Sequence, residues 1–380
     1  MINLIKKIKK LLGAGPREHN PDYILIGAVF VVIIFGLVML SSASAAKAYL
    51  DFHSTYYYFN HQLFGLGVGL VAFFFFSRLD YKILQDFAFW FLLISIFLLI
   101  LVFIPGLSAS YGKARSWINV FGYSLQPSEF VKISFLLYLS AWLDKRGTSL
   151  KDWNVGIGPF VFVLGFIGVL MLLQPDFGTL FIIGFTSLIV YYVGGGSKKH
   201  IAYILLFSVI GFIAMVNMRP YQMDRIKCMM DPGYSPDDIC FQINQSLIAV
   251  GSGGFWGRGF GESRQKFSYL PEVSSDSIFA IIGEETGMLF GVILLFFYFV
   301  VFYRGVLIAK KAPDGYGRIL AIGIVTWISV QAVINIGGII NLMPMTGVPL
   351  PLISYGGSAM LASLIAIGIL VNISKQTKVR

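Results

Sequence analysis

Charged side chains are scarce in this chain, and cysteine and histidine are scarcer. Only 13% of its 380 residues are charged, whereas 57% are hydrophobic; a soluble domain carries about a quarter charged residues. Such a chain has too little polar surface to cover a globule in water, which excludes the soluble classes. Two cysteines exclude a disulfide scaffold, and the absence of a signal-peptide cleavage site argues against a secreted product.

The chain also lacks the usual motifs of soluble catalysis. Four scattered histidines argue against a zinc site or a serine triad. No Walker sequence is present. Gly257, Gly259 and Gly261 are spaced like part of a nucleotide loop, but no strand is expected before them, so the match predicts nothing. We therefore expect no cofactor and no acidic metal cluster.

Long apolar runs are the dominant feature. Ten runs of about 17 to 25 residues are separated by turn or charge clusters, and they lack the alternation of barrel strands. They predict an all-α, polytopic integral membrane protein that forms a single domain over residues 1–380. The expected transmembrane helices are 22–42, 58–77, 87–105, 127–143, 156–173, 177–194, 200–217, 277–303, 320–341 and 352–373.

The distribution of basic residues predicts the orientation. Nineteen Lys and Arg side chains fall in one set of connecting segments and nine in the opposite set, and Lys132 alone lies within a span. Basic residues stay cytoplasmic, so both termini, 1–21 and 374–380, are expected in the cytoplasm. Topology and anionic lipid then explain the net charge of +10, with no need for a nucleic-acid partner.

One connection is much longer than the others. Residues 218–275, between the expected seventh and eighth helices, form a large segment outside the cytoplasm, and long loops tend to carry function. Cys228 and Cys240 both lie in this segment. They are able to form a disulfide in an oxidising compartment, but spacing alone leaves that open.

Ionisable groups at membrane depth are costly and are therefore candidates for function. Glu129 and Lys132 lie three residues apart in the expected fourth helix, so they share a face and can pair. A structural ion pair and a contact to substrate both fit this spacing. Gln126, Pro127 and Ser128 are typical of a helix start.

Asp276 is the more informative acid, because it stands where the long outer segment meets the eighth helix. A carboxylate there can cap the helix or act on substrate. Glu272 precedes it by four residues, and two clustered acids also invite a glycosidase interpretation. Sequence does not supply the distance that would distinguish these roles.

Several stretches together resemble the SEDS family of bacterial shape, elongation, division and sporulation proteins, and they cover spans three to ten in order. The family usually has an aromatic residue after its essential Asp, whereas Ser277 follows Asp276 here. Motifs 263–266 and 281–285 resemble the FtsW division branch more than the RodA elongation branch. The matching stretches are 114–118, 126–132, 174–179, 224–226, 269–276 and 349–358.

The resemblance implies a ten-helix glycosyltransferase that polymerises lipid II on the outer face of the bacterial cytoplasmic (inner) membrane. Asp276 matches the essential Asp and would be the general base. Lipid pyrophosphate would leave, with outward cations neutralising its charge, a task that a divalent ion such as Mg²⁺ could share. The substrate-binding residues that we expect are Lys113, Arg115, Glu129, Lys132, Arg219, Arg225, Glu272 and Ser354.

The same resemblance implies partners. They are the nascent glycan strand, membrane lipids, divisome membrane proteins and a class B penicillin-binding protein, whose single membrane helix would dock on lipid-facing spans. Two other classes compete with the enzyme. A lipid II flippase would use Glu129 and Lys132 in a polar path but should show paired broken helices. A scaffold without catalysis would leave the outer polar cluster unexplained.

Overall fold

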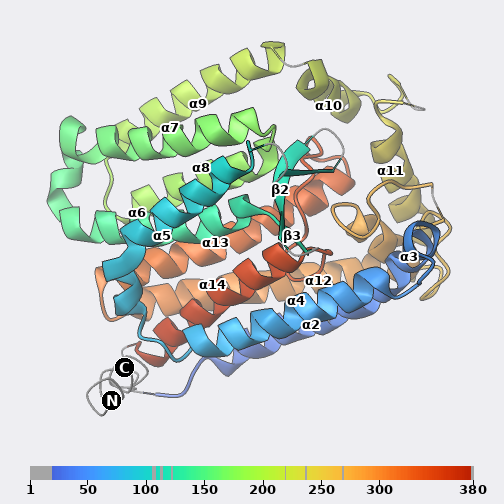
Figure 1. Ribbon diagram of the computed structural model, residues 1–380, viewed down its shortest axis with the longest axis horizontal. Helices are drawn as coiled ribbons and strands as arrows, with labels where there is room; N and C mark the ends of the chain where they lie inside the picture. Colours follow the sequence, from blue (N-terminus) through green and yellow to red (C-terminus); the bar gives the residue numbers. More distant parts are fainter. Residues whose placement is uncertain are drawn as a thin grey trace.

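A computed structural model describes residues 19–104, 108–111, 114–120, 123–218, 220–235, 238–267 and 269–377 of the chain. The fold is a bundle of long helices with one small sheet (Figure 1). In chain order, the elements are α2 (Tyr23–Ala43), α3 (Ala45–Phe52), α4 (Tyr57–Phe76), α5 (Tyr81–Leu101), β1 (Ser108–Tyr111), β2 (Ala114–Val120), β3 (Tyr123–Leu125), α6 (Pro127–Arg146), η1 (Gly147–Lys151), η2 (Trp153–Ile157), α7 (Gly158–Leu173), α8 (Phe177–Val193), α9 (Lys198–Met218), α10 (Pro220–Met230), α11 (Phe241–Gly253), α12 (Ile278–Lys311), α13 (Gly315–Ile339) and α14 (Gly357–Lys375).

Each expected membrane helix has a counterpart among these elements, and the chain is a polytopic helical membrane protein. Within the described ranges, seven segments are long and apolar enough to cross a bilayer. These are α2, α4, α5, Trp153–Leu173, α12, α13 and α14. The expected fourth, sixth and seventh spans correspond to α6, α8 and α9, which do not meet that criterion.

A capping residue and an irregular segment explain why two helices begin at other residues than expected. Asp80 accepts a hydrogen bond from the Lys82 amide, so α5 begins at Tyr81 and not at 87. The last helix begins at Gly357 and not at 352, because the proline-rich segment before it is irregular and Leu352 has φ of 67°. The helix start expected at Pro127 is confirmed, with Gln126 at the N-cap.

Polar contacts gather at both ends of the bundle. At the terminus end, Asp22 pairs with Arg304 at 2.6 Å, and its amide donates to Ser374 Oγ at 3.1 Å. At the opposite end, here called the sheet end, Gln62 Nε2 donates to Ser354 O at 3.1 Å. The long helices of the bundle run between these two ends (Figure 1).

The small sheet was not expected from an all-α pattern. Strands β1, β2 and β3 form an antiparallel sheet in sequence order between α5 and α6. The sheet lies at the sheet end, where Ser116 Oγ donates to Gln174 O at 3.2 Å and Ser358 Oγ donates to Ser124 O at 3.4 Å. Helix α5 ends shortly before Pro105 and Gly106, two residues that disfavour continuation of a helix.

Residues 218–275 are more ordered than a plain loop. They contain α10 and α11, which lie together beyond the helical bundle on the right of Figure 1. The disulfide that the sequence left open is formed: Cys228 in α10 bonds to Cys240 at the start of α11, with their Cα atoms 5.4 Å apart. Both cysteines are fully buried, and they belong to the hydrophobic core that the long helices also form.

Candidate active site

Asp276 lies at the sheet end, two residues before α12 begins. Ser277, and not Asp276, occupies the N-cap position of α12. The Asp276 side chain is partly exposed, while its backbone carbonyl accepts a hydrogen bond from Asn335 Nδ2 of α13 at 2.8 Å. The backbone is thus anchored, and the carboxylate is left available for chemistry.

The departure from the family pattern at Ser277 is accommodated by a polar contact. Ser277 is fully buried, and its hydroxyl accepts a hydrogen bond from Gln242 Nε2 of α11 at 3.0 Å. Where the family usually has an aromatic ring, α11 therefore fixes the residue after Asp276 by a hydrogen bond.

Ser354 supports the segment that carries Asp276. Its hydroxyl donates to Ser275 O at 2.5 Å and accepts from the Leu350 amide at 2.8 Å, and the Tyr355 amide donates to Ser274 O at 2.8 Å. Ser354 is itself buried. Its observed hydrogen bonds hold backbone, and its contact with substrate stays a prediction.

Glu272 lies close enough to Asp276 for its charge to act on the Asp276 carboxylate, although α12 does not extend back to include it. Its backbone adopts φ of 52°, a left-handed turn in which Glu272 O accepts from the Ser275 and Ser277 amides. Its carboxylate accepts from Ser275 Oγ at 2.8 Å and pairs with Lys47 of α3 at 3.5 Å. Lys47 is a member of the site that sequence reasoning missed, because α3 meets this turn only in the folded chain.

The surroundings of Asp276 make its carboxyl an unusually strong base. Burial raises the pKa of Asp276 to about 6, and the Glu272 carboxylate acts in the same direction. A hydrogen bond from its own backbone amide, the Arg225 guanidinium in α10 and the Ser275 hydroxyl lower this pKa and oppose the rise. The structure thus brings Asp276, Glu272 and Arg225 into one electrostatic cluster.

The remaining expected cations cannot be placed in that cluster. Lys113 and Arg219 lie outside the described residues, and for Arg115 only the backbone, in β2, is described. Within the described ranges, no three His, Cys, Asp or Glu side chains gather as a metal site. No residue is therefore assigned to a divalent ion.

The expected ion pair between Glu129 and Lys132 is confirmed. Lys132 Nζ lies 2.7 Å from Glu129 Oε1, and both side chains are 3% exposed or less. The ammonium also donates to Gln331 Oε1 at 2.8 Å and lies over the Trp327 ring, 4.8 Å from its centroid. Side chains of α13 thus cover the ion pair. A contact of Glu129 or Lys132 with substrate stays a prediction.

Helix α13 connects this pair to Asp276. Gln331 Nε2 donates to Pro349 O at 2.8 Å, and one turn later Asn335 Nδ2 donates both to Val348 O and to Asp276 O, each at 2.8 Å. Two amide side chains on one face of α13 therefore hold the proline-rich segment and the catalytic candidate in register.

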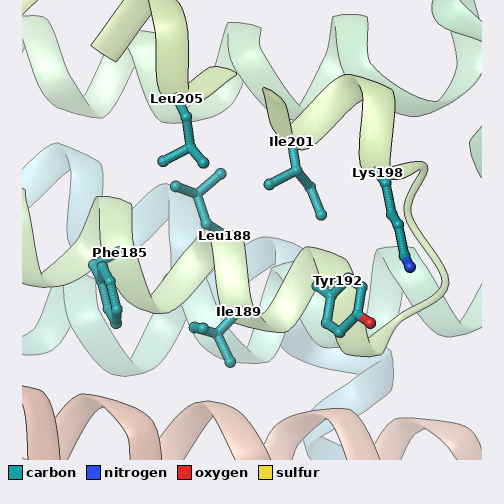
Figure 2. Close-up of a pocket in the computed structure, with 7 residues that line it drawn as sticks. All are labelled: Phe185, Leu188, Ile189, Tyr192, Lys198, Ile201 and Leu205. Atoms are coloured by element: carbon teal, nitrogen blue, oxygen red, sulfur yellow. The ribbon is translucent and has the colours of Figure 1, made fainter. Parts of the chain in front are cut away.

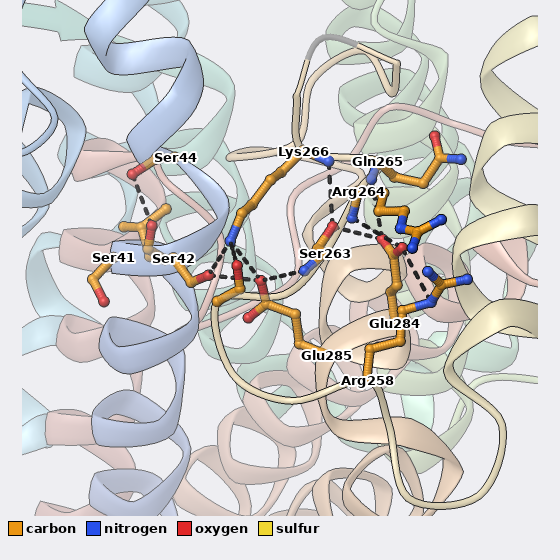
Figure 3. A network of polar contacts seen from close by, with 12 residues as sticks. Ser41, Ser42, Ser44, Arg258, Ser263, Arg264, Gln265, Lys266, Glu284 and Glu285 are labelled. Carbon is orange, nitrogen blue, oxygen red and sulfur yellow. Dashed lines mark hydrogen bonds and ion pairs between the residues drawn. The ribbon is translucent and has the colours of Figure 1, made fainter.

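A second buried network lies where α12 meets the segment 218–275 (Figure 3). Glu285 pairs with Lys266 at 3.0 Å and accepts from Ser42 Oγ of α2 at 2.7 Å. Glu284 accepts from Ser263 Oγ at 2.5 Å and lies 3.7 Å from Arg258. Adjacent glutamates within an apolar run were the available signal, but their partners are distant in sequence.

An apolar groove lies elsewhere, on the α8–α9 face (Figure 2). It has a volume of about 270 Å³, and its walls are apolar apart from Tyr192 and Lys198 at one end. None of its lining residues belongs to the Asp276 cluster. This groove is therefore not the candidate active site.

Sequence comparisons identify relatives over nearly the whole chain. A family model for cell cycle proteins, named for FtsW, RodA and SpoVE, matches residues 23–379. Stage V sporulation protein E of Bacillus subtilis (strain 168) is 37% identical over 362 residues, covering 95% of this chain and 99% of that protein. A probable peptidoglycan glycosyltransferase FtsW of the same strain is 39% identical over 371 residues, covering 94% and 91%.

Solved structures share the architecture. A structure reported under the words "structural coordination of polymerization and crosslinking by a peptidoglycan synthase complex" matches with a TM-score of 0.76 at 26% identity, covering 93% of this chain and 97% of that one. The crystal structure of the rod shape determining protein RodA of Thermus thermophilus matches with a TM-score of 0.69 at 24% identity, covering 96% and 100%. The likeness to RodA demonstrates a common fold.

Proposed function

We propose, on the premise that this chain belongs to the FtsW, RodA and SpoVE family of cell cycle proteins, that Asp276 is the general base with which it polymerises lipid II. The chain is a multi-pass membrane peptidoglycan glycosyltransferase. The observation that carries the proposal is the Asp276 carboxylate itself, which is partly exposed, anchored through its backbone, and has a pKa of about 6.

The reaction needs one proton acceptor. As the acceptor sugar hydroxyl attacks the anomeric carbon, a C–O bond forms, the bond to pyrophosphate breaks, and its electron pair leaves with the lipid pyrophosphate. Asp276 takes the hydroxyl proton. A carboxylate with a pKa of about 6 is a stronger base than an ordinary one, yet it is mostly ionised at pH 7. Attack opposite the leaving group inverts the anomeric centre.

The leaving group requires positive charge more than it requires a proton. Arg225 is the described cation that acts on Asp276, and a guanidinium suits phosphate oxygens through paired hydrogen bonds. Lys113, Arg115 and Arg219 are proposed to extend this positive surface around the pyrophosphate.

A flippase is less well supported than a polymerase. The void beside Lys132 measures about 10 Å³, the volume of about one water probe, and Gln331 and Trp327 close the pair. A lipid-linked sugar needs a far wider path. The Glu129–Lys132 pair is therefore better explained as a structural ion pair than as part of a transport path.

The biological setting is proposed from the relatives. Relatives named FtsW favour septal synthesis of the cell wall, with an elongation role of the RodA type as the alternative. We place the chain in the bacterial cytoplasmic membrane with ten spans, both termini inside and residues 218–275 outside. A class B penicillin-binding protein and divisome proteins are the proposed partners, and membrane lipids surround the apolar helices.

Reconstituted vesicles distinguish the polymerase from the flippase. Purified protein is mixed with fluorescent lipid II, and the label is followed both by gel and by a quencher that cannot cross the bilayer. A polymerase converts the label into glycan strands. Movement of the label between leaflets without any strand would instead establish a transporter.

The rate of polymerisation is expected to depend on pH through Asp276. The carboxylate must be unprotonated to accept a proton, so the rate should rise with pH through a limb centred near pH 6. Glu272→Gln removes the neighbouring negative charge that raises this pKa, so the limb should move to lower pH. Arg225→Gln removes the cation that lowers it, so the limb should move to higher pH.

Initial rates between pH 4.5 and 8 measure these limbs. The midpoint is the informative quantity, because Arg225→Gln is also expected to weaken substrate binding. A wild-type rate that stays constant from pH 4.5 to 8, or a limb that Glu272→Gln leaves in place, would contradict the assignment of the base.

Cysteine labelling tests the orientation. In a Cys228→Ser/Cys240→Ser background, Glu262→Cys places a thiol on an exposed position of the outer segment, and Lys310→Cys places one at the far end of α12. An impermeant maleimide applied to intact spheroplasts should label Glu262→Cys and should reach Lys310→Cys only after permeabilisation. The reverse pattern would overturn both the topology and an outward active site.

A further inference from the structure

Helix α12 consists of two helices separated at Gly287. Gly287 has φ of 73° and ψ of −176°, so residues 278–286 form a short helix and 288–311 a long one. The long part spans about 36 Å at 1.5 Å per residue, which is enough to cross a bilayer unaided. The short part is therefore a separate helix, about 13 Å long, and Asp276 lies two residues before its first residue.

The outer segment fills the break with its backbone. The Met288 and Leu289 amides donate to Gly254 O and Phe255 O, at 2.9 and 3.2 Å, while the Arg258 and Gly259 amides donate to the carbonyls of Glu284 and Glu285, each at 3.0 Å. A Cβ on Gly257 would collide with Glu285 O. The two segments, 254–259 and 284–289, are therefore in direct backbone contact at the end of the short helix.

Side-chain contacts of Lys266 also join the short helix to its neighbours (Figure 3). Lys266 Nζ donates to Glu285 Oε1 at 3.0 Å, to Ser42 Oγ at 3.0 Å and to Gly261 O at 2.5 Å. Lys266 is 6% exposed and Glu285 1% exposed. One ammonium thus joins three elements, namely the short helix of α12, the outer segment and α2.

Glu284 is held independently of Lys266. Besides Ser263 Oγ and Arg258, it accepts hydrogen bonds from the Arg264 and Gln265 amides at 3.1 and 3.3 Å. Glu285 has fewer donors, and its Oε2 atom is buried with no hydrogen-bond partner among the described residues. Loss of Lys266 would therefore leave Glu285 as a buried carboxylate without a countercharge, and the short helix would have to move to hydrate it.

We propose that Lys266 is a positioning residue for catalysis: by neutralising Glu285 beside the break in α12, it holds the short helix that sets the place of Asp276. The proposal rests on the assignment of Asp276 as the base. Lys266 acts through the helix and touches no reacting atom. A misplacement of a catalytic group by about 1 Å can cost as much as 100-fold in rate.

The test compares Lys266→Met, which keeps the length of the side chain and removes its charge, with wild type. We expect kcat for lipid II polymerisation to fall by about 10- to 100-fold with KM nearly unchanged. Deuterium uptake by amides of residues 278–286 should rise, while uptake by α13 stays the same. Lys82→Met is the matched control, because it breaks the exposed ion pair with Asp314 at the terminus end and should leave both readouts unchanged.

A double variant identifies the ion pair as the cause. Lys266→Met/Glu285→Gln removes both charges and keeps an acceptor for Ser42, so it should recover at least part of the lost kcat and the protection of residues 278–286. If Lys266→Met does not accumulate in the membrane, Ser42→Ala, which removes one donor to Glu285, should show the same two changes to a smaller degree.

Failure of this proposal differs from failure of the assignment of the base. Wild-type kcat in Lys266→Met, or added deuterium uptake spread evenly over α13 and α14, overturns the positioning role. If Asp276→Asn retains activity, the assigned base is wrong, whatever Lys266 does. An inactive Asp276→Asn beside a fully active Lys266→Met would leave the base assigned and remove only the positioning role.

Discussion

An Asp276→Asn variant is expected to polymerise lipid II at least about 100-fold more slowly than the wild type, a usual contribution of general base catalysis. Asn keeps the size of Asp and can still accept from Ser275 Oγ, but it cannot take up the proton of the acceptor hydroxyl. The rate is measured on purified protein at pH 7.5, where the wild-type carboxylate is ionised.

The fold should survive this substitution. Ser277 holds the N-cap position of α12, so Asp276→Asn removes no helix cap. The backbone carbonyl of residue 276 still accepts from Asn335. Thermal midpoint and yield should therefore match the wild type, and Glu272→Gln should retain activity near pH 7. An Asp276→Asn enzyme with near wild-type rate would make Glu272 the next candidate for the base.

Truncation of Glu129 is expected to destabilise the protein by about 3 to 5 kcal/mol, because Lys132 would remain as a buried charge without its counterion. Gln331 and Trp327 still face the ammonium, but neither neutralises it. The free energy of unfolding of Glu129→Ala, measured in mixed detergent micelles, tests this expectation.

Two controls separate burial from charge. Replacing both partners, as Glu129→Gln/Lys132→Met, should cost less than Glu129→Ala, because no unpaired charge remains. Breaking the exposed pair between Lys82 and Asp314 with Lys82→Ala should cost at most about 1 kcal/mol. A Glu129→Ala protein as stable as the wild type would mean that solvent reaches Lys132.

Local patterns predicted most of the helices and the main catalytic candidate. Apolar runs indicated the membrane helices because the bilayer demands their length, and Pro127 marked a helix start through its own geometry. The pairing of Glu129 with Lys132 followed from helical spacing alone. Asp276 stood out because it lies between an outer segment and an apolar helix.

Contacts between distant segments could not be predicted in this way. Lys266 and Lys47 were simply two basic residues outside the membrane, yet one is buried on Glu285 and the other pairs with Glu272. The break at Gly287 lies within the expected helix 277–303, so the sequence predicted one helix where there are two. Sequence distance hides such partners because the bundle, and not the local chain, brings them together.

The most direct measurement of the central claim is a gel of glycan products formed from labelled lipid II by the purified chain in detergent, with and without the proposed transpeptidase partner. Detergent abolishes the two compartments, so transport yields no product and only bond formation is detected. The account predicts a ladder of glycan strands from the wild type and none from Asp276→Asn. Unchanged lipid II in every lane, with folded wild-type protein and its partner present, would contradict it.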